Sequence, residues 1–99
     1  MSNSKIIWDL SARYSLKKII QYIKEDSVQN AEIVRNEVLA SINEIPKNPT
    51  RYPLDKYKKK NDSNFRAYEL YHIRIAYYVE LNAIRIIRIR STYQEPLEH

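Results

Sequence analysis

The chain has 99 residues, a formal net charge of +5 and 43% hydrophobic residues, enough for one modest core and too apolar for intrinsic disorder. It contains no cysteine and no glycine, which excludes a disulfide framework, a thiolate metal site and a glycine-rich phosphate-binding loop. No apolar run approaches the roughly 20 residues of a membrane span, and the first residues lack the apolar stretch of a secretion signal. We therefore expect a cytoplasmic protein with no membrane partner.

We expect a single domain over residues 1–96. The last three residues, 97–99, read Leu-Glu-His, which is typical of the beginning of an expression tag, so we leave them out of the functional interpretation. His72 is then the one remaining histidine. A single histidine without partner ligands gives no metal signal, so we expect neither a metal nor a cofactor.

The first half of the chain predicts one strand and two helices. Residues 5–10 form a short run with β-branched and aromatic side chains, which indicates a strand. A helix should follow, capped by Ser11 or Ser15, and Ser27 should cap a second helix that ends at Pro46. Apolar side chains recur at helical spacing in both: Leu16, Ile19, Ile20 and Ile23 in the first, and Ala31, Val34, Val38, Ile42 and Ile45 in the second.

The second half predicts a polar loop and three strands. Residues 46–64 contain prolines and lysines, and strand-like runs follow over 65–71, 73–81 and 84–91. Breaks at His72 and at Asn82-Ala83 indicate consecutive hairpins, with Asn82 as the natural left-handed turn residue. The sequence predicts an α+β fold with the order β-α-α-β-β-β: an antiparallel sheet, including a C-terminal three-stranded meander, with the helical hairpin packed on one face.

The register of the last hairpin stays open. One face of the middle strand is apolar and should form the core: Ile73, Ile75, Tyr77, Val79 and Leu81. The last strand has apolar residues on both faces, so either a bulge lies near Ile86-Ile87 or both faces are partly covered. Depending on the turn, Arg74 lies opposite Ser91 or opposite Arg90.

Three stretches together resemble the RelE/ParE toxin superfamily of type II toxin–antitoxin modules, also called plasmid stabilisation proteins. They are residues 8–12 with the helix through 19–23, the helix end and loop over 45–53, and the strands through Phe65-Arg66-Ala67, 73–77 and 84–96. The order and spacing of these stretches carry the resemblance more than any single motif.

The resemblance implies a cytoplasmic toxin that a cognate acidic antitoxin neutralises. RelE-like members are endoribonucleases, or mRNA interferases, that cut mRNA on the ribosome without a metal, whereas ParE-like members poison DNA gyrase. Arg74 matches an arginine of the family strand motif, and Arg90 and Tyr93 match basic and aromatic positions near the end of the last strand. Ser91 stands where relatives often have a histidine, and this departure leans away from RNA cleavage.

If the protein is an enzyme, Arg74 and Arg90 would stabilise the transition-state phosphate and Tyr93 would act as an acid or stack on a base. The alternative is that these are strand arginines paired with Glu69 or Glu80. Arg66 and the run Lys58, Lys59 and Lys60 could contact nucleic acid or the target, although a solvated loop is the more common explanation for three such lysines and a salt-bridged or solvated strand residue the more common one for Arg66.

Two functions therefore remain open. The first is a toxin that inhibits growth through translation or through DNA gyrase. The second is a catalytically inactive module that binds an antitoxin and co-regulates their operon.

Overall fold

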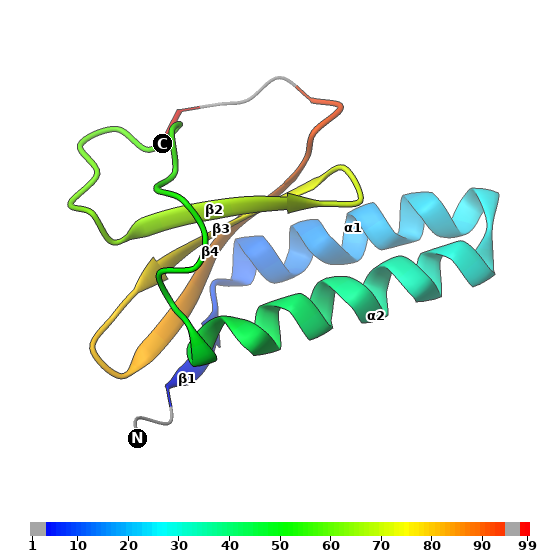
Figure 1. Ribbon diagram of the computed structural model, residues 1–99. Helices are drawn as coiled ribbons and strands as arrows, with labels where there is room; N and C mark the ends of the chain where they lie inside the picture. Colours follow the sequence, from blue (N-terminus) through cyan, green and yellow to red (C-terminus); the bar gives the residue numbers. More distant parts are fainter. Residues whose placement is uncertain (1–3, 95–97) are drawn as a thin grey trace.

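The computed structural model describes residues 4–94, 98 and 99. The chain forms a short strand, two long helices, one 3₁₀ turn and three further strands (Figure 1): β1 (Lys5–Trp8), α1 (Leu10–Asp26), α2 (Val28–Glu44), η1 (Ile45–Lys47), β2 (Phe65–Leu70), β3 (Ile73–Val79) and β4 (Ala83–Ser91). This order confirms the predicted α+β fold. No helix among the described residues is long and apolar enough to cross a membrane.

The four strands form one sheet in the order β1-β4-β3-β2. The meander from β2 to β4 is antiparallel, as predicted, but β1 pairs with β4 in parallel, so the sheet is mixed. The reason is the helical hairpin. Its two antiparallel helices bring the chain back toward the end of the sheet where β1 begins (Figure 1), and β4 consequently runs in the same direction as β1.

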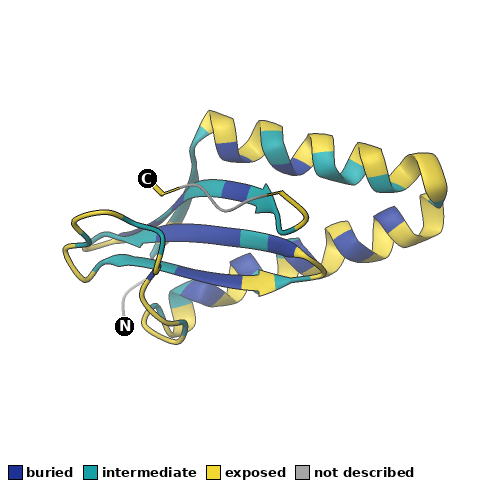
Figure 2. Ribbon diagram, turned by 90° about the horizontal axis from the view of Figure 1, so that it is seen from above, coloured by how far each residue is buried: buried dark blue, intermediate teal, exposed yellow. Residues whose placement is uncertain are grey.

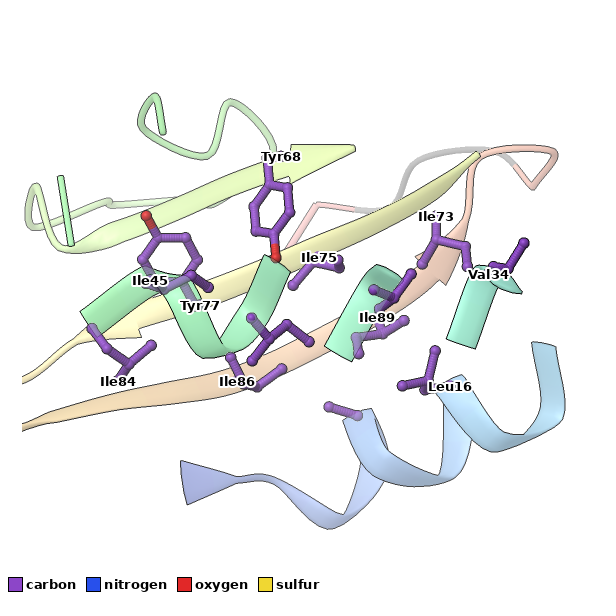
Figure 3. Close-up of a cluster of buried hydrophobic side chains, with 13 residues drawn as sticks. Leu16, Val34, Ile45, Tyr68, Ile73, Ile75, Tyr77, Ile84, Ile86 and Ile89 are labelled. Carbon is purple, nitrogen blue, oxygen red and sulfur yellow. The ribbon is translucent and has the colours of Figure 1, made fainter. Parts of the chain in front are cut away.

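The core lies between the helices and one face of the sheet (Figure 3). Every member of the predicted α2 stripe is buried, and so are Ile73, Ile75 and Tyr77 of β3. Figure 2 shows the same pattern, with buried segments on the strands and on the inner helix faces and exposed residues outside. The prediction for Leu81 is wrong: this residue lies in the turn beyond the end of β3 and is 93% exposed.

One of the two predicted helix caps is confirmed. The backbone N–H of Asn30 donates to Ser27 Oγ at 3.1 Å, which satisfies a free donor at the start of α2. Ser11 and Ser15 do not cap α1, because this helix begins at Leu10 directly after β1. Asp9 is its N-cap residue and makes no side-chain capping bond, since its carboxylate instead accepts from Arg85 at 3.3 Å.

The left-handed turn of the meander differs from the prediction, and the strand pairing fixes the register of the last hairpin. The left-handed residues of the meander are Tyr71 (φ 52°) and His72 (φ 60°), and Asn82 is not among the positive-φ residues. The β3–β4 turn closes without one, through a bond from Glu80 N–H to the Ala83 carbonyl at 2.8 Å. Arg74 lies opposite Arg90.

Of the two alternatives left open for β4, the structure shows the bulge near Ile86-Ile87. Tyr77 lies opposite Ile86 while Ala76 lies opposite Arg88, so Ile87 is the extra residue on β4. This single insertion moves the alternation of β4 by one position. As a result, Ile86 and Ile89 both reach the core.

Candidate functional site

A pocket of about 250 Å³ lies on the sheet face opposite the helices. Arg74 of β3 and Arg90 of β4, a cross-strand pair, both line it. Their neighbours on β3, Ile73 and Ile75, point into the core, so the alternation of the strand directs Arg74 to the other face. Because of the bulge at Ile87, Arg88 and Arg90 of β4 point to the same face as Arg74.

The loop between η1 and β2 supplies the remaining wall of the pocket. The Tyr52 ring stacks on Tyr68 with 3.9 Å between centroids, and Tyr77 Oη donates to the Pro49 carbonyl at 2.7 Å. The backbone N–H of Asp55 donates to the Phe65 carbonyl at 2.8 Å. These contacts fix the loop along β2 and place Asp55 beside the strand arginines.

The guanidinium of Arg74 is engaged by two carboxylates. Nη2 donates to Asp55 Oδ1 at 2.8 Å and Nη1 donates to Glu69 Oε2 at 3.1 Å. The guanidinium carbon also lies 4.7 Å from the centroid of the Tyr57 ring. Pairing with Glu69, one of the alternatives raised by the sequence, is therefore present, and Glu80 pairs with Arg85 instead.

Asp55 is the buried acidic group of the pocket, with a side chain only 1% exposed. Burial alone would raise its pKa. Hydrogen bonds with Arg74, the Tyr57 backbone N–H and His99, together with the charge of Arg74, outweigh burial and lower the pKa below its ordinary value of 3.8. Asp55 is therefore an ionised carboxylate at neutral pH.

His99 also reaches Asp55, with Nε2 and Oδ2 2.7 Å apart. Leu97, the first residue of the proposed tag segment, lies outside the described residues. Our interpretation of 97–99 as a tag remnant stays a prediction, so we assign no chemistry to His99.

The β4 side of the pocket is positively charged. The pKa of Arg88 is lowered by burial and by the neighbouring charge of Arg90. Among the residues that the structure describes, no carboxylate forms an ion pair with Arg90. Without His99, the ionisable lining contains three arginines against Asp55 and Glu69. The pocket is thus suited to bind an anionic group on its β4 side.

Tyr93 is separate from this pocket. It is 80% exposed, and its ring lies 4.8 Å from the ring of His72, at the β2–β3 turn. It does not line the pocket with Arg74 and Arg90, whereas Ser91 does. The structure therefore brings together two of the three predicted catalytic residues.

The other predicted binding residues are dispersed. Arg66 Nη1 donates to the Tyr52 carbonyl at 2.7 Å and so holds the loop against β2. Lys58 lies over the Phe65 ring at 4.6 Å, and Lys59 pairs with Glu98 at 3.6 Å. Lys60 is exposed and adopts a left-handed backbone. Arg66 thus has a structural contact, and each lysine of the run has its own environment.

Asp55 and Tyr57 are the site residues that the sequence did not reveal. Both lie in the polar loop before β2, and Asp55 precedes Arg74 by 19 residues in the sequence. No periodic pattern relates a loop residue to a strand residue at that separation.

The described side chains of the pocket are better placed to bind a charged group than to transfer protons. The carboxylates of Asp55 and Glu69 are both committed to Arg74. No group of three or more histidine, cysteine, aspartate or glutamate residues that could hold a metal ion exists within 4–94, 98 and 99.

Comparison with known proteins gives the family of the chain. Residues 6–96 match the family described as "ParE toxin of type II toxin-antitoxin system, parDE". No curated protein matches the sequence.

Two solved structures share the fold. The chromosomal ParDE TA system from P. aeruginosa has a TM-score of 0.68 at 14% identity, covering 90% of this chain and 96% of that one. The YoeB dimer from Staphylococcus aureus has a TM-score of 0.50 at 18% identity, covering 90% and 97%. The match over residues 6–96 shows that this chain belongs to the ParE toxin family of type II toxin–antitoxin systems.

Proposed function

We propose that this toxin arrests growth by poisoning DNA gyrase, without cutting RNA, and that an acidic antitoxin neutralises it in the cytoplasm. The observation that carries the proposal is the double engagement of Arg74 by Asp55 and Glu69. It affects both the cation and the two carboxylates that RNA cleavage would need.

RNA cleavage requires a base for the 2′-hydroxyl, an acid for the leaving oxygen and a cation for the transition-state phosphate. In this pocket the charge of Arg74 is already neutralised by its carboxylate partners. Asp55 and Glu69 each give one oxygen to Arg74, so a proton taken up by either carboxylate would weaken its ion pair with the arginine. Tyr93, the predicted acid, lies outside the pocket. This arrangement favours a toxin that acts by binding.

The proposed partner is a cognate antitoxin with an acidic segment. Family membership implies such a partner, and the net charge of +5 favours an acidic one. A second surface, which we call the helical groove, lies between α1 and α2. Its apolar lining includes Trp8 and Leu16, and its lining also contains four cationic residues: Arg13, Lys17, Lys24 and Arg35. No carboxylate is among its described lining residues, so its charge also suits an acidic segment.

The proposal is tested with purified protein in two parallel assays. Supercoiled plasmid, gyrase and ATP report gyrase-dependent DNA cleavage, and programmed ribosomes report mRNA cleavage. We expect cleaved DNA complexes only when the toxin and gyrase are both present, and intact mRNA. Cut mRNA without any effect on gyrase would reverse the assignment, and no effect in either assay, together with harmless expression, would favour the inactive module.

A further inference from the structure

A groove beside α1, next to the pocket of Arg74 and sharing Ser91 and Gln94 with it, brings together aromatic residues from three parts of the chain. Tyr22 of α1, Tyr71 and His72 of the β2–β3 turn, and Tyr93 after β4 line it, and its volume is about 630 Å³. We call this surface the aromatic groove. It accounts for Tyr93, which the sequence indicates as a functional residue and which the pocket does not include.

The tyrosines of the aromatic groove are unusually open to solvent. Tyr22 is 77% exposed and Tyr71 is 44% exposed. Ile19 and Ile23 of α1, which are only partly buried, add apolar surface between them. Exposed apolar surface gathered in a concave site is typical of protein-binding surfaces, and tyrosine is among the residues that contribute most to binding energy there.

The rings of Tyr71, His72 and Tyr93 have contacts that hold them in place before any partner binds. Tyr71 Oη donates to Glu37 Oε1 of α2 at 2.8 Å, and the His72 ring packs on the Tyr93 ring. The backbone N–H of Thr92 donates to the His72 carbonyl at 2.8 Å, which ties the turn to the segment that bears Tyr93. These side chains of the toxin therefore lose little further entropy when a partner binds.

The backbone of the turn is strained where it presents these side chains. Tyr71 and His72 are consecutive left-handed residues, in a two-residue hairpin turn that Asn-Gly would form with less strain. Strain of this kind is concentrated at functional sites, because the side chains it presents are needed there.

The charge of the lining indicates the class of partner. Lys18 is the one lysine or arginine among the described lining residues, and no carboxylate is among them. A nucleic acid would need more cations to offset its phosphates. An acidic antitoxin segment would match the helical groove better, because that groove has four cationic residues. An uncharged apolar protein segment fits the aromatic groove best.

We propose that the aromatic groove, built from Tyr22, the Tyr71-His72 turn and Tyr93, is where the toxin docks an uncharged apolar segment of its protein target. The inference rests on the proposed function, because it takes the target to be a protein, gyrase. It assigns target recognition to a surface distinct from the helical groove, which matches an acidic antitoxin.

The test uses Tyr22→Ala/Tyr93→Ala, with Tyr14→Ala as the matched control. Tyr14 is also an exposed tyrosine on α1 but does not line the aromatic groove. Each toxin is assayed for growth arrest, gyrase-dependent plasmid cleavage, and affinity for the antitoxin encoded beside it. Tyr22→Glu, which adds a charge to the groove without shortening the side chain to a methyl, is the second variant.

We expect the double variant and Tyr22→Glu to need at least about tenfold more toxin for arrest and for gyrase-dependent cleavage. Antitoxin affinity should stay at the wild-type value, the thermal midpoint of the double variant should fall only by the loss of the His72–Tyr93 ring contact, and Tyr14→Ala should behave as wild type. Unchanged arrest by the double variant would overturn the inference, and so would loss of antitoxin binding with gyrase poisoning intact.

Two further results separate this inference from the proposed function. If the wild-type chain arrests growth without affecting gyrase, the proposed target is wrong, while loss of arrest in the double variant would still support a target-docking groove. A single-stranded oligonucleotide that binds the wild type and is lost in the double variant would overturn the assignment to a protein segment.

Discussion

Arg74 compensates a buried charge, so its removal should first affect stability. Replacing it with alanine leaves the carboxylate of Asp55 buried without its main partner. We expect Arg74→Ala to lower the free energy of unfolding by about 3 kcal/mol, the lower end of the range for breaking a buried ion pair. Equilibrium unfolding in urea measures this loss.

Arg90 provides the matched control on the neighbouring strand. It lies directly opposite Arg74 and has no ion pair with a carboxylate of the described residues. Arg90→Ala should therefore change the free energy of unfolding by less than about 1 kcal/mol. Equal losses in both variants would show that the Arg74–Asp55 pair has no special weight.

Asp55 also predicts how stability depends on pH. Its pKa is lower in the folded chain than the ordinary 3.8, so the folded state favours the ionised form. That contribution is complete above about pH 5 and is lost as pH falls below about 4, through the folded pKa. Urea midpoints between pH 7 and pH 2.5 should fall less steeply for Asp55→Asn than for the wild type, and identical acid limbs would contradict the assignment.

At the scale of single elements, the same serine-to-alanine change should affect stability differently at the starts of α1 and α2. Ser27→Ala removes the oxygen that accepts from the Asn30 N–H and should cost about 1 kcal/mol. Ser11→Ala should be nearly neutral or slightly stabilising, because Ser11 lies inside α1 and alanine is the better helix former. Thermal unfolding of the two variants compares them directly, and a larger loss at Ser11 would contradict the observed helix start.

The β2–β3 turn offers a second test at this scale. Glycine adopts the left-handed backbone of His72 without the steric cost of a Cβ. His72→Gly and His72→Ala both remove the ring contact with Tyr93, but alanine keeps a Cβ in the left-handed backbone, so His72→Ala should lower the free energy of unfolding by about 1 kcal/mol more than His72→Gly. If alanine and glycine have the same effect, the backbone at this position is not strained.

These elements also show what could be predicted from the sequence. The helices, the meander and the bulge follow from local periodicity, since the core positions of α2 recur at helical spacing and the two faces of β4 exchange at Ile87. The parallel pairing of β1 was missed because it depends on where the helical hairpin returns the chain. The left-handed turn was assigned to Asn82 on residue preference, but strand pairing placed it at Tyr71 and His72.

The candidate site was predictable only in part, for the same reason. Arg74 and Arg90 belong to adjacent strands of a hairpin, and their pairing was one of two registers that the sequence allowed. Asp55 comes from a loop that is fixed by the Tyr52–Tyr68 stack and the bridge between Leu54 and Arg66. Those contacts are long-range, so no local pattern could bring Asp55 to Arg74.

At the scale of the whole molecule, three surfaces of different chemistry surround one small core. The open sheet face carries the arginine pocket, the helical groove is apolar with a cationic rim, and the aromatic groove is nearly uncharged. This division suits a toxin that must be recognised by an antitoxin and must also recognise a target. In the proposed function, growth arrest follows from binding, without a chemical step at Arg74.

Induction of the chain in growing cells tests this account most directly, with chromosomal breaks and transcript ends measured together. We predict that induction arrests growth and causes gyrase-dependent chromosomal breaks while transcripts stay intact. Co-expression of the antitoxin encoded beside the toxin should relieve both the arrest and the breaks. Arrest with transcripts cut on the ribosome and an unbroken chromosome would contradict the central claim.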